Sequence, residues 1–397
     1  MLRALEEVGF YLDVDKAGRR VTVEGRGGEI PNKNADLFLG NAGTAMRFLT
    51  AACCLGQGEY VLKGIPRMHE RPIGQLVDAL RELGADIEYL GNEGYPPLRI
   101  KGKGLRGGEV EMDPSTSSQF VSALLIAGAG ALGPITLSFE KVPVSIPYID
   151  MTFSIMERFG YIGRPGIAKH TTRLIIKPYK YRRTDHLAVE PDASNASYFL
   201  GAAAMFKGAS VRINGFGTIS LQGDSFFAHD CLRSMGCTTS DHATATQVVG
   251  AEKLQGIDID LNKMPDMAQT LAVVALFADG PTTIRDVGNL RVKETDRMAA
   301  LETELTKLGA IVDINGDDIR ITPPPNNILL NAANNQPMSD TNPVFIDTYD
   351  DHRMAMAFSI AGLRQPGLRI NDPACVNKTF PEFFEYLNRL HKHVKAN

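Results

Sequence analysis

Five glycines recur at an almost constant interval along this chain, and this spacing constrains the fold more than any other feature. Successive members of the set lie 73 to 76 residues apart, and each follows an apolar residue at the end of a stretch with helical character. Glycine directly after a helix favours the left-handed cap, because it has no Cβ to clash there. The sequence therefore predicts a repeated unit centred on a helix that ends at Gly9, Gly84, Gly160, Gly236 and Gly309.

Strand-like segments follow most of these glycines in pairs that predict hairpins, such as ADIEYL with PPLRIKG. One further interval of this length after Gly309 ends within FPEFFEYLNRLHKH, where the apolar residues again recur at the spacing of a helix. Six units, three in each half, predict an α/β protein with two similar domains, 1–189 and 190–397. Between two of the predicted elements, the Asn- and Pro-rich segment 326–343 is predicted to be a surface loop.

Composition argues against several functional classes. The 397 residues include 42 basic and 46 acidic ones, and a net charge of −4 argues against the large basic surface of a nucleic-acid-binding protein. No apolar run reaches the roughly 18 residues that cross a bilayer, and the first residues lack the apolar core of a signal peptide. The five cysteines show no CxxC pair or metal-binding spacing, so we expect free thiols in a reducing cytoplasm and no metal site.

The stretch GNAGTAMR (40–47) combines a tight turn with the start of an apolar helix. Its glycines let backbone N–H groups point at an anion, and the positive end of the helix favours the same kind of ligand. An ordinary glycine-rich turn would show the same pattern, and the GK[ST] ending of a nucleotide-binding loop is absent. Arg67 and Arg71 precede another predicted helix near Gly74, either as anion ligands or as a solvated charged turn.

Further stretches place polar or charged residues before apolar helices, namely DPSTSSQF (113–120), LNKMPDMAQ (261–269), NLRVKETDR (289–297) and TYDDHRMAM (348–356). Lys378 lies in the similar stretch CVNKTFP. Helix caps and surface ion pairs would explain one or two residues in each stretch. The remaining residues predict helix N-termini that gather positive potential for a ligand with more than one negative group.

These stretches, together with ERPIG, EPDASNASYFL and KTFP, resemble the 5-enolpyruvylshikimate-3-phosphate synthase family, in the family's order and over the whole chain. The resemblance implies the enolpyruvyl transferase fold, an inside-out α/β barrel. In this fold each of two domains has three βαβαββ-type repeats, and the active site lies in the cleft between the domains.

The resemblance also implies a reaction. The enolpyruvyl group of phosphoenolpyruvate would be transferred to the 5-hydroxyl of shikimate 3-phosphate, with release of phosphate, in chorismate and aromatic amino-acid biosynthesis. No cofactor, metal, nucleic acid or membrane would take part. The protein would act as a cytoplasmic monomer and as a target of the inhibitor glyphosate.

Residue roles follow from the matching motifs. Asp266 matches the acceptor of the hydroxyl proton, and Glu294 matches the acid or base that handles the methylene proton. The residues implied to bind shikimate 3-phosphate are Ser117, Ser118, Gln119, Ser145, Tyr148, Asp266, Asn289 and Lys293. The residues implied to bind phosphoenolpyruvate are Asn41, Gly43, Arg71, Gln119, Arg297, His352, Arg353 and Lys378.

The sequence departs from the family pattern in two places. The family's GSKSxSxR motif, whose Lys, Ser and Arg contact both substrates, is not found, and the repeat count leaves the first unit without its leading strands. We therefore expect that an N-terminal segment is missing and could be supplied by a fragment partner. In addition, Phe48 stands where glyphosate-sensitive members commonly have Pro, and we expect it to shift Gly43 and Thr44 and to change glyphosate affinity.

Two other functions stay open on the sequence alone. An inactive remnant or a split-gene fragment of the enzyme would keep the other motifs and lack the N-terminal one. The related enolpyruvyl transferase that acts on UDP-N-acetylglucosamine shares the fold and the cosubstrate. RVKETDR, SSQF and YDDHRMAM favour the shikimate enzyme over this relative.

Overall fold

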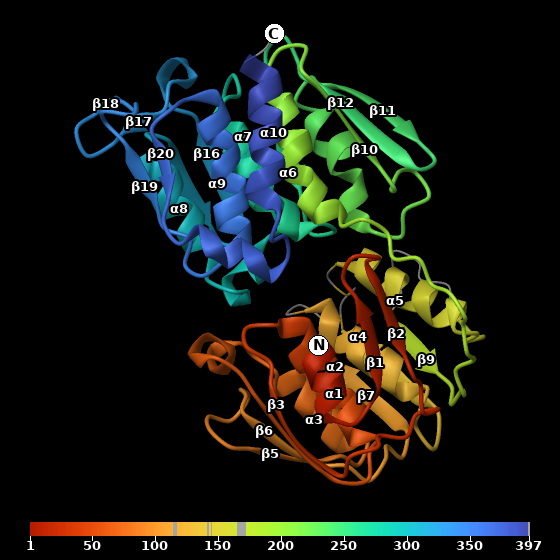
Figure 1. Cartoon of the computed structure of the whole chain (residues 1–397). Helices are drawn as coiled ribbons and strands as arrows, with labels where there is room; N and C mark the ends of the chain where they lie inside the picture. The colour runs from red at the N-terminus through yellow and green to blue at the C-terminus, as the bar shows by residue number, and fades with distance from the viewer. Residues whose placement is uncertain (114–116, 141–142, 144, 165–171, 396–397) are drawn as a thin grey trace. The chain divides into compact units, whose positions relative to one another are not determined.

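The protein is represented by a computed structural model that describes residues 1–113, 117–140, 143, 145–164 and 172–395, of which 391–395 are described by their backbone only (Figure 1). The chain divides into two compact units, Met1–Leu187 and Ala188–Asn397. The boundary therefore lies between residues 187 and 188, where the sequence had placed it between 189 and 190.

The first unit alternates short strands with helices. Its helical segments are α1 Leu2–Glu7, α2 Gly43–Cys54, η1 Pro66–Glu70, α3 Gly74–Glu82, α4 Ser118–Gly128 and α5 Ile146–Arg158. Its strands are β1 Leu12–Asp15, β2 Arg20–Val23, β3 Asn34–Phe38, β4 Glu59–Lys63, β5 Asp86–Tyr89, β6 Leu98–Lys101, β7 Gly108–Met112, β8 Ile135–Phe139 and β9 Arg173–Ile176.

The second unit follows the same alternation. Its helical segments are α6 Ala193–Ala204, η2 Gly223–Phe226, η3 Ala228–Leu232, η4 Pro265–Met267, α7 Ala268–Ala275, η5 Gly288–Val292, α8 Arg297–Lys307, η6 Pro325–Asn327, α9 His352–Arg364, η7 Pro373–Lys378 and α10 Phe383–Lys395. Its strands are β10 Ser210–Asn214, β11 Thr238–His242, β12 Ala245–Val249, β13 Asp258–Asp260, β14 Thr282–Arg285, β15 Ile311–Asn315, β16 Asp318–Thr322, β17 Leu330–Asn331, β18 Gln336–Pro337, β19 Val344–Ile346 and β20 Leu368–Ile370.

One four-stranded sheet in each unit shows the complete repeat. In the first unit β3 and β4 are parallel, β6 pairs antiparallel with β4, and β5 pairs antiparallel with β6. The second-unit sheet β13-β14-β16-β15 has the same order and the same strand directions. Since α2 joins β3 to β4 and α7 joins β13 to β14, both sheets confirm the expected βαβαββ repeat.

The five glycines that define the interval all adopt the left-handed backbone, with φ between 85° and 99°. The hairpins β1–β2, β5–β6, β11–β12 and β15–β16 each follow one of them, and the strand β9 follows the remaining one. This conformation favours glycine, because any Cβ would be strained there. The predicted link between the glycine interval and the repeat is therefore confirmed.

The structure adds detail to two local predictions. The predicted helix before Gly236 is present, and its residues Ala228–Leu232 form a π-helix, η3. The segment 326–343 was predicted to be a surface loop, but it contains the two short antiparallel strands β17 and β18. The π-helix and the β17–β18 pair each depend on a few backbone hydrogen bonds, and these cannot be predicted from amino-acid composition.

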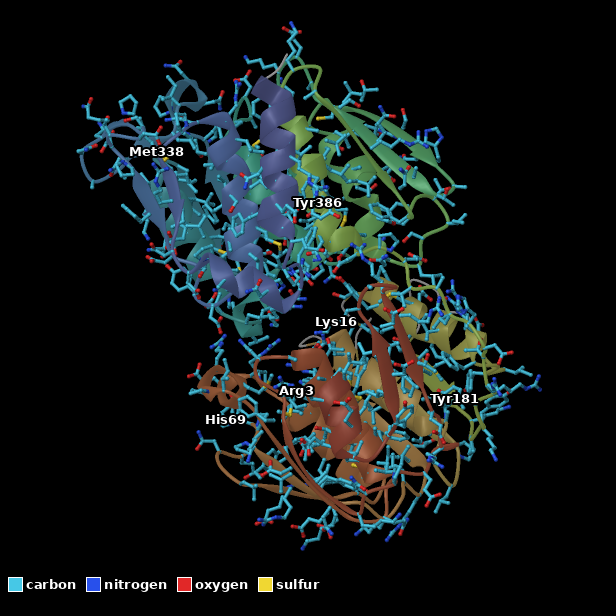
Figure 2. All side chains as sticks on the ribbon, in the orientation of Figure 1. Arg3, Lys16, His69, Tyr181, Met338 and Tyr386 are labelled. Atoms are coloured by element: carbon cyan, nitrogen blue, oxygen red, sulfur yellow. The ribbon has the colours of Figure 1, made fainter. Side chains whose placement is uncertain are left out.

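Helices that are apolar along most of their length form the core of the second unit. Every residue of α7 is buried, and α6 and α9 are almost as enclosed. A helix that is apolar all round lies inside the protein, so its polar residues gather near its ends. Figure 1 shows α6, α7 and α9 beside one another, and Tyr386 of α10, labelled in Figure 2, lies with its ring 6.5 Å from that of Phe199 in α6.

Candidate functional site

The second unit holds a buried ion-pair cluster centred on Arg297, the first residue of α8. The Arg297 side chain is 1% exposed, and its three nitrogens contact three carboxylates. Nη1 donates to Asp266 at 2.9 Å, Nη2 donates to Glu294 at 3.0 Å and Nε donates to Asp351 at 2.7 Å. The sequence also allowed the charged residues of 289–297 to form ion pairs on the protein surface. That alternative interpretation is therefore wrong for Arg297.

Asp266 lies between Arg297 and two further cations. Its second oxygen accepts a hydrogen bond from Arg353 at 3.1 Å, and Lys293 Nζ lies 3.6 Å from its first oxygen. Burial raises the pKa of Asp266, but Arg353, Lys293 and Arg297 outweigh burial and hold this pKa well below its ordinary value. Asp266 was alternatively interpreted as a helix cap, but α7 begins at Ala268 without a side-chain cap.

Glu294 connects the Arg297 cluster to Lys378. Lys378 Nζ donates to Glu294 Oε1 at 2.7 Å, while the other Glu294 oxygen accepts from Arg297. Asn289, in η5, has a buried Oδ1 that accepts no hydrogen bond from any residue that the structure describes. A buried acceptor left in this state costs free energy, and a hydroxyl of a bound ligand would satisfy it.

His352 and Arg353 open α9, and Asp351 caps this helix by accepting from the Arg353 N–H at 2.9 Å. His352 is 3% exposed, and burial together with the charge of Arg353 lowers its pKa to about 3. The imidazole is therefore neutral near pH 7. Among the described residues, neither His352 Nδ1 nor Arg353 Nη1 has a hydrogen-bond partner, although His352 Nδ1 lies 3.6 Å from Asp351 Oδ1, so each buried atom has capacity to bind a ligand.

In the first unit two buried guanidinium groups meet at the N-terminus of α2. Arg47 and Arg71 are each 4% exposed. Arg71 Nη1 donates to the carbonyl and side-chain oxygens of Asn41, at 3.0 and 3.1 Å. A Cβ at Gly43 would lie 2.6 Å from Arg71 Nη2 and closer still to Arg47 Nη1, so this approach requires glycine. The positive end of the helix and the two guanidinium groups together favour an anion.

Gln119 joins α4 to this anion site. Arg47 Nη1 donates to Gln119 Oε1 at 3.0 Å, and Gln119 Nε2 donates to Thr44 Oγ1 at 3.1 Å. Ser117 is the N-cap of α4, because its hydroxyl accepts from the Gln119 N–H at 3.3 Å. Ser118 is buried in the first turn. Ser115 and Thr116, which belong to the same sequence stretch, lie outside the described residues.

Ser145 and Tyr148 lie at the start of α5. Ser145 is the N-cap residue, is 4% exposed and has a left-handed φ of 56°. The Tyr148 N–H donates to the Ser145 carbonyl at 3.0 Å. Because α5 packs on α4, where Ser122 and Thr152 hydroxyls lie 2.7 Å apart, both residues belong to the same part of the unit as Gln119.

The expected site residues thus divide between the two units. The first unit holds Asn41, Gly43, Arg71, Ser117, Ser118, Gln119, Ser145 and Tyr148. The second unit holds Asp266, Asn289, Lys293, Glu294, Arg297, His352, Arg353 and Lys378.

The sequence assigned no role to two residues that the structure adds. Arg47 reaches Gln119 and stacks over the Phe120 ring, 5.3 Å from its centroid. The sequence feature that could have identified Arg47 is a single cation inside an otherwise apolar helix. Asp351 is fully buried against Arg297, and its signal was an acid that immediately precedes an apolar helix.

Among the described residues, no three His, Cys, Asp or Glu side chains are grouped so that they could hold a metal ion. In the same part of the chain, no helix combines the length and the apolar character that crossing a membrane requires.

Comparison with known proteins gives one consistent family. A profile of EPSP synthase (3-phosphoshikimate 1-carboxyvinyltransferase) matches residues 1–387. The 3-phosphoshikimate 1-carboxyvinyltransferase of Aliivibrio fischeri (strain MJ11) is 50% identical over 392 residues, which cover 98% of this chain and 87% of the relative. The chloroplastic enzyme of the same name from Arabidopsis thaliana is 46% identical over 412 residues, covering 99% of this chain and 75% of the relative.

Solved structures agree with these relatives. EPSP synthase from Acinetobacter baumannii superimposes with a TM-score of 0.75 at 26% identity, covering 98% of this chain and 86% of that one. The enolpyruvyl transferase NikO from Streptomyces tendae, with a TM-score of 0.70 at 18% identity, covers 98% of this chain and 85% of its own and shares the fold. The α/β enolpyruvyl transferase fold is therefore confirmed, and the chain belongs to the EPSP synthase (3-phosphoshikimate 1-carboxyvinyltransferase) family of transferase enzymes.

Proposed function

We propose that this chain transfers the enolpyruvyl group of phosphoenolpyruvate to the 5-hydroxyl of shikimate 3-phosphate and releases phosphate. In the addition step the hydroxyl oxygen bonds to C2 of the enolpyruvyl group, the hydroxyl proton leaves and C3 gains a proton. In the elimination step C3 loses a proton, the bond between C2 and the phosphate oxygen breaks, and phosphate leaves. The substrates carry two phosphates and carboxylates, so the site must supply several positive groups.

The observation that carries this proposal is the cluster around Arg297, where cations and carboxylates share one buried site. Asp266 is ionised there and can accept the hydroxyl proton. While Arg353 binds it, Asp266 is a weak base because its pKa is low. A ligand anion that draws Arg353 away would raise this pKa and activate the carboxylate at the moment of binding. Glu294 would exchange the methylene proton.

Four cations of the second unit would bind the negative groups of the ligands. Arg297, Arg353 and Lys378 are proposed to bind phosphoenolpyruvate, and Lys293 is proposed to bind shikimate 3-phosphate. Arginine suits carboxylate and phosphate groups because its planar fork donates two parallel hydrogen bonds. Neutral His352 would add an N–H or an acceptor without extra charge, and Asn289 would bind a hydroxyl through its unsatisfied oxygen.

The anion site of the first unit is proposed to serve the same pair of substrates. Gly43, Arg71 and Asn41 would hold phosphoenolpyruvate at the start of α2, and Arg47 would support them through Gln119. The hydroxyls of Ser117, Ser118, Ser145 and Tyr148 would bind shikimate 3-phosphate together with Gln119. Hydroxyl and amide groups suit a ligand that carries several hydroxyls and one phosphate.

The assembly and location of the protein are also proposals. The family resemblance supports a monomer that acts in the cytoplasm on small molecules, and a fragment partner is proposed as an addition. Size-exclusion chromatography with light scattering would test the monomer directly. A stable dimer of the purified chain would overturn that part of the proposal.

Phosphate release tests the function. Purified chain should release phosphate when both shikimate 3-phosphate and phosphoenolpyruvate are present, and should release none with either substrate alone. The assay should be repeated with the unmatched part of the Aliivibrio fischeri relative added as a separate polypeptide. Folded chain that releases no phosphate under either condition would overturn the proposal, and UDP-N-acetylglucosamine as acceptor is the control for the related transferase.

A further inference from the structure

A second buried acid of α8 lies outside the Arg297 cluster. Glu304 is 0% exposed, and an acidic side chain is rarely buried to this extent unless it is paired. It follows Arg297 by seven residues, and about two helical turns bring the two side chains to the same face of α8. The partners of Glu304, however, belong mainly to the stretch of chain just before α9.

The Glu304 carboxylate holds the segment that joins β19 to α9, residues 347–351, here called the connecting segment (Figure 1). The Tyr349 hydroxyl donates to Glu304 Oε1 at 2.6 Å, and the Asp347 N–H donates to Glu304 Oε2 at 3.1 Å. Lys307 Nζ lies 2.8 Å from Glu304 Oε2 and 2.7 Å from Asp347 Oδ2, so one ammonium group joins both carboxylates. Glu304 thus anchors both the backbone and a side chain of the connecting segment to α8.

The connecting segment contains a tight turn with an unfavourable backbone. The Asp351 N–H donates to the Thr348 carbonyl at 2.8 Å. The two residues between them, Tyr349 and Asp350, both have a φ of 54°. Turns with two positive φ angles at their centre are normally built from glycine, asparagine or aspartate, so a tyrosine there is strained and persists only where its surroundings hold it. The hydrogen bond from the Tyr349 hydroxyl to the buried Glu304 is such a restraint.

The turn leads directly into residues of the candidate site. Asp351 ends the turn, caps α9 and pairs with Arg297. His352 and Arg353, both proposed to bind phosphoenolpyruvate, follow it in the first turn of α9. Helix α8 therefore holds this stretch at two points, through Glu304 near its start and through Arg297 at its end.

We propose that Glu304 is a positioning residue for phosphoenolpyruvate binding, which acts through the Tyr349 hydroxyl on the start of α9. This inference rests on the proposed function, since it treats His352 and Arg353 as ligands of that substrate. When the hydrogen bond between Glu304 and Tyr349 is removed, the turn relaxes towards negative φ and the two ligands lose their fixed position. The Asp351 cap remains, so α9 stays folded and the affinity for the substrate falls.

Steady-state kinetics of two variants tests this inference. Y349F removes only the hydroxyl, and E304Q removes one acceptor while it keeps the size of the side chain. Each should raise the KM for phosphoenolpyruvate about three- to tenfold, the range expected for loss of one hydrogen bond, and leave the KM for shikimate 3-phosphate within about twofold. A purely structural role would instead reduce the active fraction, and with it kcat, at unchanged KM values. E302Q, which neutralises an exposed acid of the same helix, is the matched control and should behave as the wild type.

The double variant E304Q/Y349F shows whether the two residues act together. Since both single changes break the same hydrogen bond, the KM for phosphoenolpyruvate in the double variant should lie within about twofold of that in E304Q. Single-variant effects that multiply in the double variant would mean that the residues act separately, and would overturn the inference. An unchanged KM for phosphoenolpyruvate in both single variants, or equal rises for both substrates, would also overturn it.

Hydrogen exchange provides a readout that needs no substrate. The amides of Arg353 and Ala355 both donate to Asp351, and they should exchange faster in Y349F than in the wild type. The amides of β16, in the same unit, should exchange at equal rates in both proteins and report that the fold is intact. Equal exchange at Arg353 and Ala355 in Y349F and wild type would overturn the inference. Wild-type chain that turns over neither substrate would overturn the proposed function alone, and faster exchange at the start of α9 would then still establish that Glu304 and Tyr349 position this turn.

Discussion

The Arg297 guanidinium and the Asp351 carboxylate form a two-point ion pair that solvent does not reach. Arg297 Nε lies 2.7 Å from Asp351 Oδ2, and Nη2 lies 3.3 Å from Oδ1. The side chains are 1% and 0% exposed. Asp351 also caps α9, so this one carboxylate fixes both the start of that helix and the orientation of the guanidinium that Asp266 and Glu294 share.

Replacing Asp351 by Asn should lower the free energy of unfolding of the second unit by about 3–5 kcal/mol, because it leaves a buried guanidinium without its closest countercharge. Asn can still cap α9, so the loss would report the charge rather than the cap. Urea unfolding followed by circular dichroism measures the change. D350N, at the exposed neighbouring position, is the matched control. A loss for D351N below about 1 kcal/mol would show that Asp266 and Glu294 compensate for it.

His352 should make stability depend on pH. Its pKa is lowered to about 3 in the folded chain, so the unfolded chain binds this proton first as the pH falls. The corresponding stability is fully present above the unfolded value of about 6.5 and is lost as the pH falls towards the folded value, with a slope of up to about 1.4 kcal/mol per pH unit. H352Q should show a flatter pH dependence between about pH 4.5 and 6.5, a range that lies above the ordinary carboxylate pKa values.

H242Q, which removes an exposed histidine of the same unit, is the control for this pH experiment. It should retain the slope of the wild type. Equal slopes for H352Q and wild type would mean that the imidazole gains a proton in the folded chain near its ordinary pKa.

The repeat could be predicted from the sequence because its signals are local. A glycine that ends a helix and an apolar run that forms the next helix each depend on a few neighbouring residues, as at Gly84 and Gly309. The motifs also identified most of the polar residues that both clusters contain. In the second unit the cluster gathers at the N-termini of α8 and α9, where the sequence had placed polar residues before apolar helices.

The partners within each cluster could not be predicted in this way. Arg47 binds Gln119 across 72 residues, and Arg297 binds Asp351 across 54. Such pairs depend on how helices pack, which a single sequence does not encode locally. Asp266 illustrates the same limit, since an acid before an apolar helix predicts a cap, yet three cations on other elements determine its orientation.

Replacing Gly43 by Ala should weaken phosphoenolpyruvate binding at least tenfold, or about 1.4 kcal/mol. The new Cβ would occupy space that the Arg71 and Arg47 guanidinium groups now fill, so both must withdraw from the start of α2. Steady-state kinetics should show a higher KM for phosphoenolpyruvate and a much smaller change for shikimate 3-phosphate. G25A is the control, because a Cβ there meets no atom within 4 Å. Unchanged KM values in G43A would remove this turn from the site.

Replacing Asp266 by Asn should lower kcat by about 10²–10⁴-fold, the range expected for loss of a positioned general base. Asn has nearly the same shape and keeps an oxygen for Arg353, so binding of shikimate 3-phosphate should change less than kcat does. Single-turnover phosphate release together with a binding titration separates the two effects. D260N, which alters an exposed acid of β13, is the control. Equal losses in affinity and kcat would identify Asp266 as a binding residue only.

Replacing Phe48 by Pro should change the inhibition constant for glyphosate. Phe48 lies in the second turn of α2 and packs against the core of the first unit. Proline has no N–H to bond the residue 44 carbonyl, and its ring clashes with that carbonyl. Thr44 would therefore move, and Gln119, which donates to the Thr44 hydroxyl, would move with it and disturb Arg47.

F48L is the control, because it removes the ring but keeps the N–H. The inhibition constants are measured on active enzyme. A change in F48P that F48L lacks would assign the effect to the backbone of α2, while equal constants for F48P and wild type would show that position 48 does not control the anion site.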